Sequence, residues 1–189
     1  PALRYLTERG VTKDDILKWK IGFCKDGEYA GRVVIPSFNE NGYANYYVAR
    51  SYGFEWPKYK NPPASRDIIF NELYVNWDED LVIVEGVFDA IKAGNGIPLL
   101  GSTLREGSAL LQAIVKSGNR VYLALDEDAS KKTRSIIRLL QRYGVEVYEV
   151  DTSGVEDVGD MSKEDFQSRK DNAAIVEKDN YLLQRLFAI

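Results

Sequence analysis

Hydrophobic positions recur with two different periods along the chain, and the change between them divides it near residue 80. Before that point, residues 1–20 have the spacing of two short helices, the second of which begins at an N-cap, Thr12. Strand-like runs then cover residues 32–38 and 43–50 and are joined by Asn39-Glu40-Asn41-Gly42. Because Asn-Gly between two such runs is typical of a hairpin turn, a small α+β region is predicted here.

Beyond residue 80, short apolar segments alternate with amphipathic ones that each end at a glycine. The apolar segments predict strands at residues 81–85, 97–100, 120–125 and 145–150, and the amphipathic ones predict helices at 87–93, at 106–117 and up to 143. Strand–helix alternation of this kind is typical of a parallel sheet covered by helices, and two closing helices are expected at 162–169 and 172–187. The sequence therefore predicts an α/β fold in three regions: an α+β subdomain at 1–78, a Rossmann-like sheet domain at 79–160 and C-terminal helices at 161–189.

The chain of 189 residues contains one cysteine and no histidine, which narrows the chemistry available to it. Without histidine, Cys/His zinc sites and Ser-His-Asp hydrolases are excluded. Carboxylates are plentiful, so the chemistry is expected to use carboxylates, bound cations, lysines or hydroxyls. The lone cysteine, the short apolar runs and the missing signal-peptide pattern predict a reducing, cytoplasmic location with no membrane partner. The chain opens within a helical pattern, which is compatible with a fragment of a longer protein.

Charge is distributed unevenly. Residues 1–60 carry 10 Lys and Arg against 7 Asp and Glu, a net charge of +3, whereas residues 61–189 carry 15 against 22, a net charge of −7. A basic first third followed by an acidic remainder suits a polyanion-binding surface combined with a metal-binding one. Chance explains a difference of this size equally well.

Acidic residues follow two of the predicted parallel strands. Glu85 and Gly86 follow the first, and Asp126, Glu127 and Asp128 follow the third. Ligands bind at the carboxyl ends of strands in such sheets, and neighbouring strands lie about 5 Å apart, so Glu85 could converge with the two aspartates on one cation. In extended backbone Asp126 and Asp128 would point to the same side. Oxygen ligands alone favour Mg²⁺ or Mn²⁺, and Gly86 would allow a phosphate or backbone to approach closely. The alternative is that these carboxylates are solvated loop residues or helix N-caps.

The same segments resemble the landmarks of a known family. Residues 81–91, 100–103 and 125–129 are similar to the three motifs of the topoisomerase–primase (TOPRIM) domain. The upstream half is similar to DnaG-type primases of bacteria and phages, in the segments Ala2–Gly22, Gly31–Pro36, Ala49-Arg50, Pro57–Asn61 and Ile69–Tyr74. Asp157-Val158-Gly159-Asp160 is similar to a late acidic motif of the same family. The resemblance extends over nearly the whole chain in the family's order.

This resemblance implies the RNA polymerase core of a DNA primase, a nucleotidyltransferase that makes short RNA primers on single-stranded DNA. It implies Glu85, Asp126 and Asp128 as catalytic metal ligands for Mg²⁺ or Mn²⁺, with Asp89, Asp157 and Asp160 as further candidates. Residues implied to bind template or nucleotide are Arg32, Arg50, Lys58, Asn61, Gly86 and Lys131. Its partners would be single-stranded DNA, ribonucleoside triphosphates, a replicative helicase and a zinc-binding domain outside this chain. A TOPRIM-type nuclease and a catalytically silent DNA-binding replisome subunit remain alternatives.

The chain also departs from the family pattern. Asn71 and Glu72 stand where a lysine is common, and Ser130 stands where a glycine follows the aspartate motif. The segment between Gly22 and Gly31 is short, which points to a compact, phage-type version. No zinc-binding module and no Walker-type phosphate loop occur in the sequence, so a helicase motor is not included.

Two further features allow nucleic-acid binding independently of the family. Lys131, Arg134, Arg138 and Arg142 fall on one side of a predicted helix, where they could follow a phosphate backbone or form an ordinary solvated face. Four tyrosines near the hairpin could stack on unpaired bases, although packing within the strands is the commoner role: Tyr43, Tyr46, Tyr47 and Tyr52.

Overall fold

The structure is a computed structural model that describes residues 1–155 and 157–177. It divides into two compact units, Pro1–Val75 and Asn76–Ile189, and each is described by itself. The boundary lies close to the one expected after residue 78. The C-terminal segment, expected as a separate region from residue 161, is part of the second unit.

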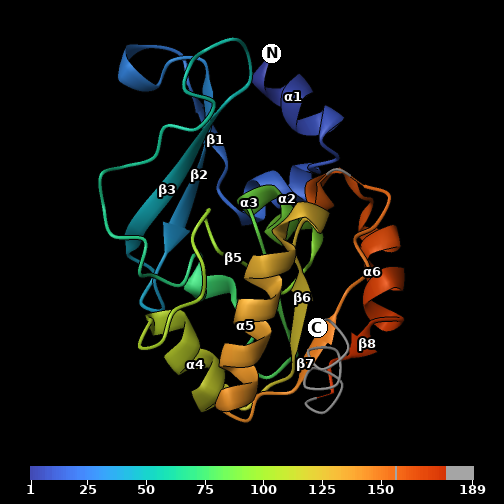
Figure 1. Cartoon of the computed structure of the whole chain (residues 1–189). Coiled ribbons are helices and arrows are strands. Elements are labelled where there is room, and N and C mark those ends of the chain that lie inside the picture. The colour runs from blue at the N-terminus through green and yellow to red at the C-terminus, as the bar shows by residue number, and fades with distance from the viewer. Residues whose placement is uncertain (156, 178–189) are drawn as a thin grey trace. The chain divides into compact units, whose positions relative to one another are not determined.

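The first unit is a small α+β domain. Helices α1 (Ala2–Glu8) and α2 (Lys13–Lys18) precede strand β1 (Gly22–Cys24), the single turn η1 (Gly27–Tyr29), strands β2 (Arg32–Phe38) and β3 (Ala44–Ser51), and the single turn η2 (Glu72–Tyr74) (Figure 1). Helix α2 starts at the expected N-cap: the Thr12 hydroxyl accepts a hydrogen bond from the Asp15 amide at 3.1 Å, and the Asp15 carboxylate accepts one from the Thr12 amide at 3.0 Å.

Strands β1, β2 and β3 form an antiparallel sheet in that order, so the predicted hairpin is present as β2 and β3. At its turn Gly42 has φ +80°, a left-handed conformation that glycine adopts without strain. Val33, Ile35 and Val48 are fully or almost fully buried and form the core side of the hairpin. Asn71 connects the end of β2 to the following chain by two hydrogen bonds. Its side-chain oxygen Oδ1 accepts one from the Phe38 backbone amide, and its own backbone amide donates one to the Ser37 hydroxyl.

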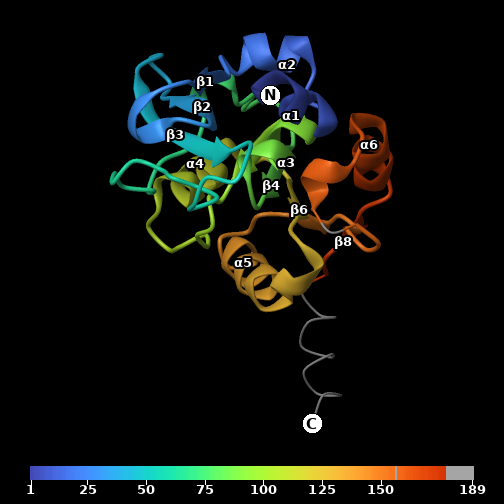
Figure 2. The same ribbon diagram turned by 90° about the horizontal axis from the view of Figure 1, so that it is seen from above.

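The second unit contains a five-stranded sheet in the order β5-β4-β6-β7-β8. Strands β4 (Leu81–Val84), β5 (Gly96–Pro98), β6 (Val121–Ala124) and β7 (Val147–Glu149) run parallel, as the apolar runs predict. The intervening helices are α3 (Val87–Lys92), α4 (Ala109–Ser117) and α5 (Ser130–Arg142), followed by α6 (Lys163–Asp171), with the single turns η3 (Glu127–Ala129) and η4 (Val158–Asp160). Helix α5 crosses in front of β6 in Figure 1, and Figure 2 shows α5 and α6 apart from each other with β6 and β8 between them. The α/β fold with flanking helices is thereby confirmed.

One predicted element differs. Residues 174–175, expected inside a closing helix at 172–187, form strand β8 (Ala174–Ile175), which pairs antiparallel with β7. Ala174 lies opposite Glu149 and Ile175 opposite Tyr148, so the chain completes the open edge of the sheet with backbone hydrogen bonds. Residues 178–187 of the expected helix lie outside the described part. Among the helices described, the longest has 13 residues and a basic face, and none could cross a bilayer.

Candidate functional site

The acidic edge of the sheet forms as the strand order requires. Strands β4 and β6 are direct neighbours, with Val84 opposite Ala124, so the residues that follow them emerge at the same edge. Glu85 follows β4 immediately, and Asp126 lies just beyond the end of β6. β4 is buried along its whole length and β6 at every residue but Tyr122, which fixes the ends of both strands and therefore the positions from which these carboxylates extend.

The surroundings of Asp126 disfavour the charged form of its carboxylate. Its Oδ1 atom is buried and has no hydrogen-bond partner among the described residues. Burial, together with the negative charges of Asp157, Glu85 and Asp128, raises the pKa of Asp126 to about 6. A carboxylate oxygen without a donor, among other carboxylates, is a group that a cation would stabilise.

Glu85 already has a cationic partner. The Lys132 ammonium on α5 lies 2.6 Å from Glu85 Oε2, and both side chains are only about one-fifth exposed. Lys132 also lowers the pKa of Asp126, against the larger effects that raise it. The Lys132 ammonium therefore lies beside Glu85 and partly neutralises the negative charge of Glu85 and Asp126.

Asp128 lies differently from expectation. The extended backbone predicted through Asp126 and Asp128 is wrong, because β6 ends at Ala124 and Asp128 belongs to the single turn η3. Its side chain is exposed rather than aligned with Asp126 by strand alternation. Among the side chains that the structure describes, no three carboxylates or thiols are grouped closely enough to hold a metal ion. The metal site predicted from sequence thus stays a prediction, with its candidate ligands at one edge.

Asp89 and Asp157 form a second carboxylate pair. Asp89 Oδ2 accepts a hydrogen bond from the Gly86 amide at 2.7 Å, which caps α3, and the Asp89 carboxyl is also hydrogen-bonded to Asp157. Burial and the shared hydrogen bond raise the pKa of Asp89 to about 8, so Asp89 holds its proton near neutral pH. This pair connects α3 to η4, whereas Asp160, at the end of η4, is exposed.

Gly159 makes that connection possible. A Cβ atom there would lie 2.9 Å from Asp89 Oδ1 and 3.0 Å from Asp157 Oδ1. The Gly159 amide donates a 2.8 Å hydrogen bond to Asp157 Oδ1. The late acidic motif is therefore held against α3 by a glycine contact that no other residue could make without a shift.

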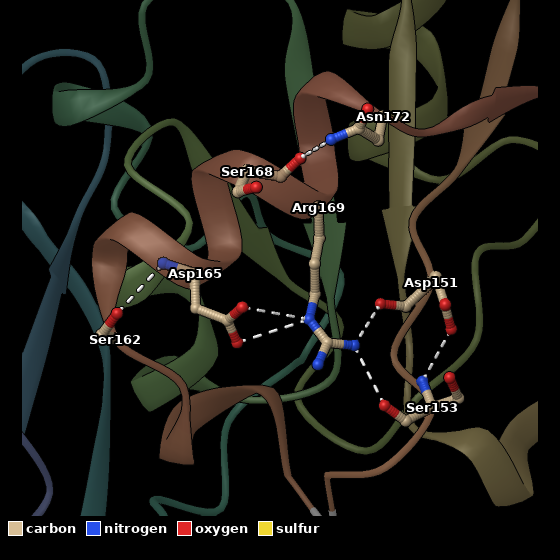
Figure 3. A network of polar contacts seen from close by, with 7 residues as sticks. All are labelled: Asp151, Ser153, Ser162, Asp165, Ser168, Arg169 and Asn172. Atoms are coloured by element: carbon tan, nitrogen blue, oxygen red, sulfur yellow. Dashed lines mark hydrogen bonds and ion pairs between the residues drawn. The ribbon is translucent and has the colours of Figure 1, made fainter.

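A cavity of about 420 Å³ with a mixed apolar and polar lining opens beside Asp126 at the ends of β6 and β7. Its lining combines carboxylates, hydroxyls and an amide, from Asp126, Ser130, Glu149, Asp151, Thr152 and Asn172. Arg169 on α6 holds the loop that forms one side of the cavity. Its guanidinium donates hydrogen bonds to the carbonyl oxygens of Asp151 and Ser153 at 2.9 and 3.0 Å (Figure 3). Asp165 holds the same guanidinium by an ion pair of 3.3 Å, so the loop after β7 is tied to α6.

Three of the basic residues expected to bind nucleic acid, Arg32, Arg50 and Lys58, lie in the first unit and differ in exposure. Arg32 and Arg50 are buried: Arg32 donates to the carbonyl oxygens of Ala30 and Pro57 at 3.2 and 2.9 Å, and the Arg50 guanidinium lies 4.7 Å from the centre of the Tyr59 ring. Lys58 is exposed. These contacts support a positioning role for the two arginines and leave Lys58 as the side chain available to a phosphate.

Other side chains expected to bind nucleic acid are Asn61, which is hydrogen-bonded within the first unit, and four basic residues of α5, which are exposed. Asn61 accepts a hydrogen bond from the Ala49 amide at 3.3 Å, so it holds its segment to β3. On α5, Ile136, Ile137 and Leu140 are buried, and Lys131, Arg134, Arg138 and Arg142 all lie on the exposed side. Arg142 is paired with Glu106 at 3.4 Å.

Sequence reasoning missed Lys132 and Arg169. For Lys132 a signal existed: it lies four residues before the buried Ile136, so it falls toward the core side of α5, where a lysine needs an acidic partner. Nothing in the sequence pointed to Arg169, because its partners are mainly backbone carbonyls of a loop.

The fold and the acidic edge together define a class: a mainly parallel α/β sheet with carboxylates at its carboxyl edge, preceded in the chain by a small α+β unit. No family model matches the chain. The DNA primase of Thermotoga maritima is 31% identical to it over 137 residues, which make up 62% of this chain and 24% of that protein. The chain thus spans about a quarter of the length of this curated relative.

Solved structures give the same indication. The DnaG primase catalytic domain bound to ssDNA has a TM-score of 0.77 at 18% identity, covering 92% of this chain and 72% of that one. For the E. coli primase catalytic core the TM-score is 0.75 at 17% identity, with 92% and 73% covered. For the Aquifex aeolicus primase with its zinc-binding and RNA polymerase domains it is 0.66 at 24% identity, with 92% and 49% covered. The chain has the fold of DnaG-type primase catalytic cores, and the resemblance carried by its motifs is confirmed.

Proposed function

We propose that the chain is the catalytic core of a DnaG-type DNA primase, which joins ribonucleotides into short RNA primers on a single-stranded DNA template. The observation that carries the proposal is the position of Asp126 beside Glu85 at the carboxyl edge of a primase-type sheet, with a buried oxygen that lacks a donor. The relative from Thermotoga maritima and the neighbour bound to ssDNA support the same activity.

In this proposal Glu85, Asp126 and Asp128 hold Mg²⁺ or Mn²⁺. The bound cation would neutralise phosphate charge and activate the 3′-hydroxyl that attacks the α-phosphorus of the incoming nucleotide. The chemistry of the donor set fits, because it is made of oxygens alone and because burial, together with the neighbouring negative charges, raises the pKa of Asp126. Asp89 and Asp157, already paired with each other, hold η4 in place and are positioning residues in this scheme.

The other residues bind and orient the substrates. Lys58 contacts template or triphosphate oxygens, and the cavity beside Asp126 gives room for part of a nucleotide at the acidic edge. A replicative helicase and a zinc-binding domain are partners that we expect outside this chain, the latter because the Aquifex aeolicus neighbour includes one.

Primer synthesis tests the proposal directly. The protein is incubated with single-stranded DNA, labelled ribonucleotides and Mn²⁺, and the products are separated by size. Labelled oligoribonucleotides that disappear with Asp126→Asn support the primase. A shortened template supports a nuclease instead, and DNA binding without either product supports a silent binding subunit.

The metal ligands are tested without any substrate. If Mg²⁺ binds only the native state with a Kd of about 1 mM, 10 mM Mg²⁺ adds roughly 1.4 kcal/mol to the free energy of unfolding. For a chain of this size the melting temperature then rises by about 2–4 °C. Asp126→Asn should remove this rise, and it should increase the metal-free melting temperature by relieving repulsion. An equal Mg²⁺ response in both proteins would contradict the proposed metal site.

A further inference from the structure

Two large aromatic side chains of the first unit are almost completely exposed. Phe54 is 106% exposed and Trp56 is 88% exposed, more than any other large hydrophobic residue among those described. Both belong to the loop of residues 52–58 that follows β3. Burying such a ring stabilises a protein, so two rings left in solvent on one loop indicate a surface that binds a ligand or partner.

The loop is held in a defined conformation. At its base the Ser51 amide donates to the Lys58 carbonyl oxygen at 3.0 Å, and Arg50 pairs with Tyr59 in an antiparallel bridge. The buried Arg32 guanidinium donates to the Pro57 carbonyl oxygen at 2.9 Å. The two rings are therefore exposed on a loop whose backbone is held at both ends by hydrogen bonds.

Glu55, the residue between the two rings, is held by contacts with Ser51 and Gly31. The Glu55 carboxylate accepts a 2.8 Å hydrogen bond from the Ser51 hydroxyl and lies against Gly31, where a side chain would leave it no room. Attraction by Arg32 also helps to lower the pKa of Glu55, after its hydrogen bonds. Glu55 is itself exposed, but these contacts hold its carboxylate at Ser51 and Gly31, while the rings on either side of it stay in solvent.

The charge around the loop favours one kind of partner. Lys58 is exposed at the loop's end, and Arg50 lies over the Tyr59 ring. Exposed aromatic rings with a cationic side chain close by in the chain, here Lys58, are typical of surfaces that bind single-stranded nucleic acid, because bases stack on the rings while the cation meets a phosphate. Two rings separated by a carboxylate are far too small an area for a stable protein interface.

We propose that Phe54 and Trp56 form a stacking platform for unpaired bases of a single-stranded nucleic acid, with Lys58 contacting its backbone. This inference rests on the proposed function, since it names the loop that would grip the template. It assigns the tyrosines of the hairpin a smaller part, because Tyr46 is buried and Tyr47 donates a hydrogen bond to Tyr29.

The test separates stacking on bases from contacts with phosphates. Fluorescein-labelled oligothymidylate of about 15 nucleotides and an abasic oligomer of equal length are titrated with the whole chain. Trp56→Ala and Phe54→Ala should each weaken binding of the base-containing strand about fivefold or more, leaving the abasic strand and the salt slope unchanged. Lys58→Ala should weaken both strands. Most of the tryptophan quenching by the strand should be lost in Trp56→Phe, because Trp19 is buried and Trp77 is only half-exposed.

Tyr43→Ala is the matched control. Tyr43 is 73% exposed but lies at the turn of the β2–β3 hairpin, about 25 Å along the strands from the loop, so binding should not change. Wild-type affinity in both loop variants overturns the inference while the primase proposal stands. Equal losses for base-containing and abasic strands overturn it as well, as does self-association that disappears with Trp56→Ala. A wild type that binds neither strand overturns the primase proposal together with it.

Discussion

Lys132 places a positive charge beside the carboxylates that we propose as metal ligands. Its ammonium and Glu85 are 2.6 Å apart and mostly shielded from water, so they are coupled more strongly than a surface pair. A cation bound by Glu85 has to compete with this ammonium. Lys132→Met should therefore lower the metal-free free energy of unfolding by about 1 kcal/mol and strengthen the Mg²⁺-induced rise in melting temperature.

The neighbouring lysine provides the control for this prediction. Lys131 is exposed on the other side of α5, and Lys131→Met removes the same charge from the chain without touching Glu85. Thermal unfolding of both variants with and without Mg²⁺ measures the difference. If Lys131→Met and Lys132→Met respond alike, net charge rather than the Glu85 pair governs the metal response.

Asp89 gives the protein a pH dependence with a definite sign. Its pKa is raised from 3.8 to about 8, chiefly by burial, so the native state keeps a proton that the unfolded chain releases above pH 4. The resulting stabilisation is complete below about pH 4 and is lost as the pH rises through about 8. In EDTA, the melting temperature should fall between pH 5.5 and 8.5, a window chosen from these pKa values. Asp89→Asn should flatten this fall, because the amide can donate to Asp157 without titrating, and an unchanged slope would exclude Asp89 as its source.

The contact between α3 and η4 depends on one small residue. Because a Cβ at position 159 would press on Asp89 and Asp157, Gly159→Ala should lower the free energy of unfolding by about 1–3 kcal/mol, with or without Mg²⁺. Gly22→Ala is the control, since a Cβ on β1 meets no atom within 4 Å and φ there is not positive. Denaturant unfolding of the two variants decides the matter. Equal stabilities would mean that η4 moves away from α3 at no cost.

The elements show where sequence reasoning succeeds and where it stops. Strands β4, β6 and β7 could be predicted because each lies in a short, mainly apolar run bounded by glycine and polar residues, although only β4 is buried along its whole length. Strand β8 could not, because two residues carry no periodicity and their pairing depends on the edge that β7 leaves open. Asp128 was misjudged for a related reason: the residue where β6 changes into η3 is set by tertiary packing and is not encoded in an Asp-x-Asp spacing.

The two compact units have different charge and different proposed tasks. The anchored aromatic loop and Lys58 belong to Pro1–Val75, while the carboxylate edge belongs to the second unit. Residues 1–75 carry 11 Lys and Arg against 9 Asp and Glu, a net charge of +2, whereas residues 76–189 carry 14 against 20, a net charge of −6. Binding of a polyanion and binding of a cation would then be separable properties of one chain, each changed by a substitution that leaves the other unchanged.

This separation can be tested in one pair of variants. Lys58→Ala removes one phosphate contact, so the dependence of log affinity for single-stranded DNA on log salt should decrease by roughly 0.7, while the Mg²⁺-induced rise in melting temperature stays at its wild-type value. Asp126→Asn should show the reverse: wild-type affinity and salt slope, no Mg²⁺ response and no primer. Lys116→Ala, an exposed lysine on α4 of the second unit, controls for loss of charge and should change neither property. The physical reason for the contrast is that a phosphate contact releases counterions without touching the acidic edge, whereas the amide at position 126 removes a cation ligand without altering any basic side chain. If Lys58→Ala abolished the Mg²⁺ response, or if Asp126→Asn lost the salt slope, the two activities would share one site and the assignment of tasks to separate units would be wrong.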